Sequence, residues 1–267
     1  MNNPSYILMR YTILSMTYKL KCVKDYIIIT FFKIHFLFYV NSWIGVFCLI
    51  VTIDGPAGSG KSSTAREVAR RTGFNHLDTG AMYRGITVAA IEAGISPEEH
   101  SKLTKLLSSI TLSFANEDGK TVLYLNDRNV STEIRSRETS KNVSAYSAIA
   151  EVRAAMTQLQ QELAHAADTV CEGRDMGTVV FPHAELKFFM VASLEERAKR
   201  RLQDLHTETI SFDEMAREIA QRDTLDSTRA EAPLLEPADA YRLDTTDLTF
   251  EEQVAYIIRK IEHSKTV

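Results

Sequence analysis

Residues 53–63 read IDGPAGSGKSS, with Gly55, four further residues, and then Gly60-Lys61-Ser62. This spacing is the P-loop pattern, in which backbone N–H groups, a lysine and a hydroxyl surround phosphate groups. The preceding LIVTID is a short, β-branched apolar run, and the following KSSTAREVARRTG has a helical pattern of small apolar residues. A strand, a glycine-rich turn and a helix are the context that the pattern requires. The sequence therefore predicts a site for nucleotide phosphates.

The P-loop residues have separate expected roles. Backbone N–H groups of residues 57–62 should point at an anion, helped by the N-terminus of the next helix. Lys61 should reach the β- and γ-phosphates, and the Ser62 hydroxyl is the expected Mg²⁺ ligand. The predicted ATP-binding set is Gly55, Pro56, Ala57, Gly58, Ser59, Gly60, Lys61, Ser62 and Ser63.

The composition fits one globular α/β domain with a small insertion. The chain has 267 residues, of which 45% are hydrophobic and 25% charged, and a formal net charge of −4. This length suffices for a sizeable core, and the absence of excess basic residues argues against nucleic-acid binding. Cys22, Cys48 and Cys171 lack the spacing of a disulfide framework or a zinc site. A reducing, cytoplasmic location is the default expectation.

Residues 1–48 differ from the rest of the chain, because they contain no Ala, Glu or Gln. The stretch YIIITFFKIHFLFYVNSWIGVFCLIV is apolar enough for a membrane span. However, Lys33 and His35 fall inside it, and it runs without a linker into the strand before the P-loop. We interpret 1–48 as a hydrophobic extension outside the working protein, upstream of a true start near Val46 or Leu49. A membrane anchor is the alternative, and we expect no membrane partner.

Beyond the P-loop, alternating strand and helix patterns predict a parallel sheet flanked by helices in a domain over 49–267. The predicted strands are FNHL, DTVCEGRD, ELKFFMVAS and YRLDTT. The predicted helices include one through Ala93, a long one at about 137–166, and the closing TFEEQVAYIIRKIEH. Two Ser-x-x-Glu capping boxes, at Ser193 and Ser211, predict a pair of helices joined by a short polar link.

The alternation breaks between residues 95 and 135. SPEEHSKLTKLLSSI begins with Ser96, Pro97 and Glu99, a combination typical of a helix start at Pro97. TLSF, TVLYL and NVSTEI then read as short strands separated by turn residues. We therefore expect a small α+β insertion over 95–135 on the parallel core.

Several arginines indicate what receives the phosphoryl group. Arg84 and Arg174 follow turns at the carboxyl ends of predicted strands, where ligands bind in open α/β sheets. Arg197, Arg200 and Arg201 share one helical face. Two phosphate-bearing substrates would explain so many cations at one edge. An acceptor phosphate is already an anionic nucleophile, so it needs no general base.

Four motifs, in order and spacing, resemble bacterial cytidylate kinases: TIDGPAGSGKSS, LDTGAMYR, EGRDMGTVVFP and QRDTLDSTRAEAPL. The resemblance covers about 49–265. It implies a fold similar to adenylate kinase, Mg²⁺-dependent transfer of the γ-phosphate of ATP to CMP or dCMP, and a monomer. It also implies that 95–135 is the nucleoside-monophosphate-binding insertion and that 193–222 is a short lid.

The resemblance also implies site residues. The implied CMP-binding set is Thr79, Arg84, Ser144, Arg153, Arg174, Asp175, Arg222, Asp226 and Arg229, and the implied catalytic set is Lys61, Arg174, Arg197, Arg200 and Arg201. Within the first set, Ser144, Arg153 and Asp175 resemble the cytosine readers. Independently, a carboxylate such as Asp175 accepts from the amino group of cytosine and repels the carbonyl oxygen of uracil. The alternatives are another P-loop small-molecule kinase and a membrane-tethered nucleotide-binding protein.

Overall fold

The computed structural model describes residues 48–117, 120–205 and 210–265. These residues belong to one compact unit, Cys48–Val267. The interpretation of residues 1–48 as an extension or an anchor falls, except for Cys48, outside the described residues. Within the described ranges, no helix is both long and apolar enough to cross a membrane.

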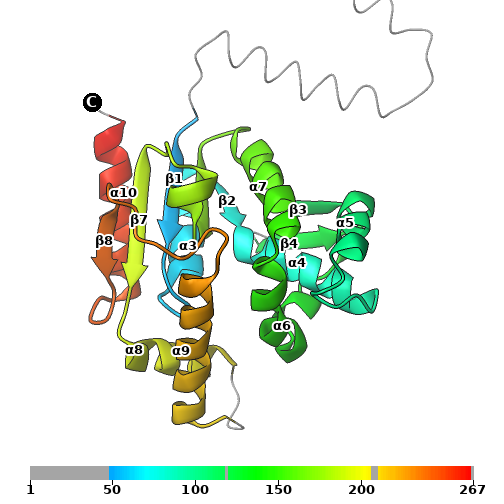
Figure 1. Ribbon diagram of the computed structural model, residues 1–267. Coiled ribbons are helices and arrows are strands. Elements are labelled where there is room, and N and C mark those ends of the chain that lie inside the picture. Colours follow the sequence, from blue (N-terminus) through cyan, green and yellow to red (C-terminus); the bar gives the residue numbers. More distant parts are fainter. Residues whose placement is uncertain (1–47, 118–119, 206–209, 266–267) are drawn as a thin grey trace, which may run out of the picture. The chain divides into compact units, whose positions relative to one another are not determined.

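The centre of the unit is a parallel sheet with the strand order β2 (Asn75–Asp78), β6 (Thr169–Gly173), β1 (Ile50–Asp54), β7 (Leu186–Val191) and β8 (Tyr241–Asp244) (Figure 1). β1 lies between β6 and β7, and all five of its residues are buried. An apolar run buried on both faces is what a central parallel strand requires. The predicted parallel sheet is confirmed.

Helices cover both faces of this sheet. α3 (Lys61–Thr72) and α10 (Phe250–Ser264) pack on the side to which Val51 and Ile53 point. α4 (Thr79–Glu92) and α7 (Ala150–Ala164) pack in a second core that includes Cys171. Because side chains alternate along a strand, the strand residues divide between the two cores.

The insertion contains α5 (His100–Ser109) and an antiparallel sheet of β3 (Leu112–Glu117), β4 (Lys120–Leu125) and β5 (Arg128–Asn129) (Figure 1). The prediction that the helix starts at Pro97 is wrong. Glu99 N–H donates to Ser96 O at 3.1 Å, and Ser96 N–H donates to the Glu99 carboxylate at 3.0 Å. These residues therefore close a separate turn, and the helix begins only at His100.

Two other predicted elements are shorter than expected. The strand predicted over NVSTEI ends at Asn129, because the Asn129 side chain accepts from Ser131 N–H at 2.9 Å and a 3₁₀ turn follows at Glu133–Arg135. The single helix predicted over 137–166 is two helices, α6 (Arg137–Ser147) and α7. The chain breaks between them because Ile149 is extended (φ −77°, ψ 128°).

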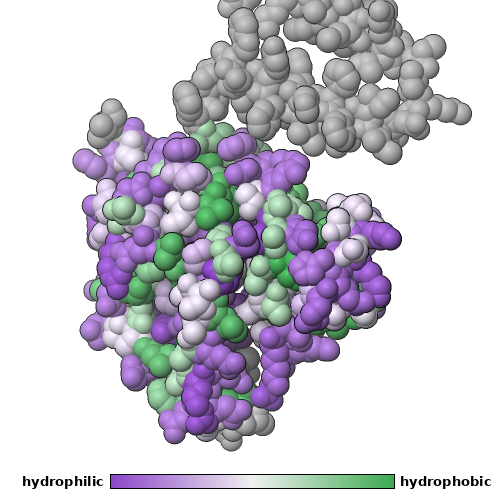
Figure 2. Space-filling view, in the orientation of Figure 1, coloured by the Kyte–Doolittle hydropathy of each residue, from purple (hydrophilic) through white to green (hydrophobic). Residues whose placement is uncertain are grey.

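After β7, α8 (Leu194–Leu205) and α9 (Phe212–Thr228) form the predicted helix pair. Ser193 Oγ accepts from Glu196 N–H and Ser211 Oγ accepts from Glu214 N–H, each at 3.2 Å. The two helices pack against each other through a small apolar cluster. In the view of Figure 2, hydrophilic side chains predominate on the surface of α9. Both serine caps that the sequence predicts are confirmed.

Gly55→Ala should destabilise the fold through a clash with the neighbouring strand. A Cβ at this position would lie 2.0 Å from Met190 O, and the residue has a φ of +148°. We expect a loss of about 3 kcal/mol in the free energy of unfolding, measured by denaturant titration. Gly73→Ala is the control, because Gly73 also has a positive φ but no described heavy atom within 4 Å of the added Cβ. Its expected cost is only about 1 kcal/mol, and equal costs would contradict the clash.

Candidate active site

The P-loop joins the end of β1 to the start of α3. Gly60 has a left-handed conformation (φ 91°), and α3 begins at the next residue, Lys61. Lys61 is 5% exposed, and its Nζ donates to Pro56 O at 2.8 Å. Burial, with the charge of Arg174 as the second cause, lowers the pKa of Lys61 to about 7. An anion bound here would stabilise the charged lysine.

Glu172, at the end of β6, lies beside the P-loop. Ser62 Oγ donates to Glu172 Oε2 at 2.6 Å, and Thr79 Oγ1 donates to the Glu172 main-chain carbonyl at 2.6 Å. Glu172 Oε1 is buried without a hydrogen bond and lies 3.6 Å from His76 Nε2. Burial raises the pKa of Glu172, but His76 and Lys61 outweigh it, so the pKa is lowered. A hydroxyl and an ionised carboxylate are the oxygen donors that Mg²⁺ prefers.

The sequence interpretation missed Glu172 and His76. A signal for Glu172 was available, since a carboxylate near the carboxyl end of a predicted core strand lies at the ligand-binding edge of such a sheet. No comparable signal marked His76, which the sequence places only near the end of the second strand. Its proximity to Glu172 follows from the pairing of β2 with β6.

A second group of cations lies beside the P-loop. Arg174 Nε donates to Asp226 Oδ2 at 2.8 Å, and Arg222 Nε lies 3.9 Å from the same oxygen. Burial, followed by the charges of Arg174 and Arg84, lowers the pKa of Arg222 to about 9. The Nε atoms of Arg84 and Arg222 are buried and have no hydrogen-bond partner among the described residues. Asp226 therefore pairs with only some of the arginine N–H groups in this group of cations. The remaining N–H groups favour an anionic ligand.

Asp175 is the centre of a third group. Arg153 Nη2 donates to Asp175 Oδ2, and Arg229 Nη2 lies 3.5 Å from Asp175 Oδ1. The Arg153 guanidinium also lies over the Tyr83 ring, 5.4 Å from its centroid. Burial raises the pKa of Tyr83 to about 12. Tyr83 is a member of this group that the sequence interpretation missed.

The remaining predicted residues have separate surroundings. Arg197 Nη1 donates to Ala57 O at 3.0 Å, so α8 contacts the P-loop. Arg200 Nη2 donates to Thr245 O at 2.6 Å, beyond the end of β8. Arg201 lies close enough to Arg84 and Arg222 to lower the pKa of both.

Ser144 is placed only indirectly. It lies on α6, one turn before Ser147, whose carbonyl accepts from Arg153 Nη1 at 3.1 Å. The structure therefore brings the end of α6 to the Arg153 side chain. A contact between the Ser144 hydroxyl and a substrate stays a prediction.

Asp54 connects the P-loop strand to the loop that carries Asp175. Its Oδ1 accepts from Met176 N–H at 2.9 Å and its Oδ2 from Gly177 N–H at 2.7 Å. These donors begin a π-helical turn, Met176–Val180, directly after Asp175. Burial raises the pKa of Asp54 to about 6, and the two N–H groups counteract part of this effect. Asp54 was not among the predicted site residues.

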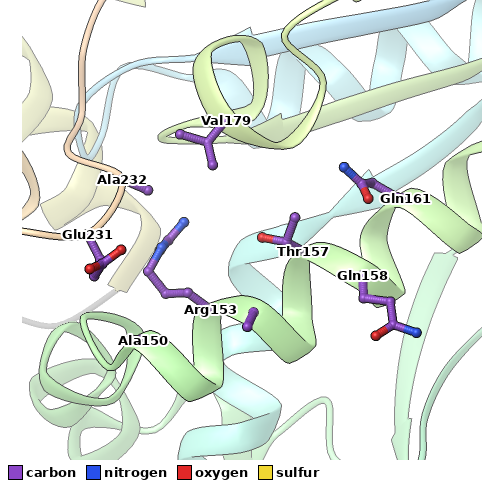
Figure 3. A pocket seen from close by; sticks show the side chains of 9 residues that line it. Ala150, Arg153, Thr157, Gln158, Gln161, Val179, Glu231 and Ala232 are labelled. Carbon is purple, nitrogen blue, oxygen red and sulfur yellow. The ribbon is translucent and has the colours of Figure 1, made fainter.

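A cavity of about 580 Å³ lies on the outer side of Arg153. It is lined by α7, the π-helical turn and residues 231–232, and Figure 3 shows Arg153 and Thr157 extending from α7 toward the space beneath Val179. Arg153 and Glu231 are the charged residues of its lining. Lys61, Arg84, Arg174 and Arg222 do not line this cavity, so it is not the P-loop site.

A P-loop between a buried strand and a helix, with buried arginines at the same sheet edge, defines a P-loop nucleotide-binding α/β protein. The family model for cytidylate kinase matches residues 51–263. The chain belongs to the cytidylate kinase family.

Two relatives that are named cytidylate kinases agree with this assignment. The chain is 43% identical over 210 residues to a cytidylate kinase of Halalkalibacterium halodurans, an alignment that covers 78% of this chain and 95% of the relative. It is 46% identical over 215 residues to a cytidylate kinase of Limosilactobacillus fermentum, covering 79% and 95%. Among solved structures, a shikimate kinase of Bacteroides thetaiotaomicron matches 82% of this chain and 99% of that chain, with a TM-score of 0.43 and 10% identity.

The raised pKa of Asp54 predicts a pH-dependent stability difference between the native chain and Asp54→Asn. The folded-state pKa of about 6 exceeds the ordinary 3.8, so the folded chain binds more protons between these values. The contribution of Asp54 to the free energy of unfolding is therefore lost as pH rises through this window. Relative to Asp54→Asn, the native free energy of unfolding should fall by about 2 kcal/mol between pH 4 and pH 7. Urea titrations at several pH values measure this difference, and a constant difference would contradict the shift.

Proposed function

We propose that this chain transfers the γ-phosphoryl group of ATP to CMP or dCMP, giving ADP and CDP or dCDP. One observation carries the proposal. Lys61 of the P-loop is buried and Arg174 and Arg222 are partly buried near it, so that burial and mutual repulsion lower the pKa of Lys61 and of Arg222. Two phosphate-bearing ligands that meet at this position would supply the missing negative charge.

The proposed ATP site is the P-loop, Gly55–Ser63. Its backbone N–H groups and Lys61 would hold the β- and γ-phosphates, except for the predicted donor Ala57, whose N–H donates to Asp223 Oδ1 at 3.1 Å instead. Positioning and charge stabilisation carry most of the catalysis there. Ser62, together with Glu172, would hold Mg²⁺, which neutralises charge that develops on the phosphates. The Ser62 hydroxyl and the Oε1 of Glu172, which accepts no hydrogen bond, support this assignment.

The proposed CMP site has a phosphate end and a base end. Arg84, Arg174 and Arg222 would bind the acceptor phosphate, with Asp226 orienting Arg174 and contacting the ribose. Asp175, Arg153 and Ser144 would read the base. Arg229 would engage the ribose or phosphate, and Thr79 would border the site. The ion pairs of Asp175 with both arginines support a single fixed orientation of its carboxylate.

Arg197, Arg200 and Arg201 are proposed to surround the transferred phosphoryl group from the lid, residues 193–222. The insertion, residues 95–135, is proposed to close over the monophosphate and so exclude water. Both segments belong to a proposed kinase domain over 49–267. A monomeric state and a cytoplasmic location stay predictions.

An acceptor panel tests the proposed reaction. ADP formation from ATP and Mg²⁺ would be measured for the full chain with CMP, dCMP, UMP, AMP and shikimate. We expect the highest kcat/KM for CMP and dCMP, because the base site offers a carboxylate to the cytosine amino group. ATP binding without turnover of any monophosphate, or preferred turnover of shikimate, would contradict the proposal.

Asp175→Asn should relax the discrimination between CMP and UMP. The native carboxylate only accepts hydrogen bonds, whereas an amide can also donate to the uracil carbonyl. We expect the kcat/KM ratio of CMP to UMP to fall about tenfold or more. Asp239→Asn is the matched control, since Asp239 is an exposed carboxylate paired with Lys187 and lies outside this group. An unchanged ratio in Asp175→Asn would remove Asp175 from base recognition.

A further inference from the structure

Asp223 connects the helix pair α8–α9 to the P-loop. It lies on α9 next to Arg222, and its Oδ1 accepts from Ala57 N–H at 3.1 Å. Its Oδ2 accepts from Arg197 Nη1, and the same Nη1 donates to Ala57 O at 3.0 Å. The carboxylate, the guanidinium and the peptide groups of Ala57 therefore form a closed ring of hydrogen bonds between three segments.

Arg197 is also held from its other sides. Its Nε donates to Ala192 O at 3.1 Å, and the residue is only 8% exposed. The Cβ of Arg197 lies 3.1 Å from the position that a Cβ on Gly58 would occupy, so the base of the side chain packs against the P-loop. A guanidinium fixed in this way loses little further freedom when it meets a phosphate.

We propose that Asp223 is the positioning residue for Arg197 in phosphoryl transfer. This inference rests on the proposed function and adds to it a residue that does not itself touch the substrates. Asp223 holds the Arg197 guanidinium beside the phosphate-binding turn, where a displacement of about 1 Å at a catalytic group costs on the order of 10²-fold in rate. A carboxylate accepts hydrogen bonds only and repels phosphates, so we expect Asp223 to act through Arg197 and not by binding ATP itself.

The charges around Asp223 make a purely structural role the rival explanation. Asp223 also lies close enough to Arg174 to raise the pKa of that arginine. Loss of its charge would therefore affect two cations and the anchoring of α9. The two explanations differ in one respect, because a positioning role depends on Arg197 and an anchoring role does not.

A double-mutant cycle on kcat distinguishes the positioning role of Asp223 from a purely structural role. Asp223→Asn, Arg197→Ala and the double variant would be assayed in the full chain with ATP, Mg²⁺ and CMP, with melting temperatures measured alongside. We expect Asp223→Asn to lower kcat about tenfold or more without raising KM for ATP. In the Arg197→Ala background, the same substitution should change kcat less than twofold. Glu218→Gln, which removes an exposed carboxylate from the same helix, should leave kcat unchanged.

An equal loss of kcat in both backgrounds, or a raised KM for ATP with unchanged kcat, would overturn the inference. Asp223→Glu provides a second variant in case Asp223→Asn does not fold. It keeps the charge but displaces it by one methylene, so it should lower kcat in the native background only. Inactivity of the native chain toward CMP would instead refute the proposed function, which distinguishes the two failures.

Discussion

The close grouping of cations around the P-loop is the constraint on which the site depends. Lys61, Arg174 and Arg222 lie close together at one edge of the sheet, and burial and mutual repulsion lower the pKa of two of them. Buried charges are costly unless they are paired. Asp226 and Glu172 supply only part of the compensation. The folded protein therefore keeps a preorganised group of cations whose charge an anionic ligand would balance.

The carboxylates connect this region to the rest of the fold. Asp54 ends β1 and pairs in register with Gly173 on β6, so the P-loop begins next to the segment that carries Arg174 and Asp175. Asp54 then accepts the first N–H groups of the turn after Asp175. The P-loop and the loop that carries Asp175 are consequently fixed to the same two central strands.

Much of the fold could be predicted because it follows local rules. The β-branched run before Gly55 specifies the central strand, and the serines at 193 and 211 specify two helix starts. The errors have local causes as well, since they arise where side chains compete with the regular backbone pattern. Glu99 closes a turn instead of capping a helix at Pro97, and the Asn129 side chain ends a strand.

The sequence by itself determined the P-loop, the parallel sheet and the placement of arginines near strand ends, because these depend on spacing and periodicity along the chain. It did not determine which charges meet. Ser62 and Glu172 are 110 residues apart, and Ala57 and Asp223 are 166 residues apart. Their contacts exist because the strand order places β6 beside β1 and because α9 returns to the P-loop. Only the tertiary structure decides such pairings, since hydrogen bonds between distant segments produce no repeating residue pattern in the sequence.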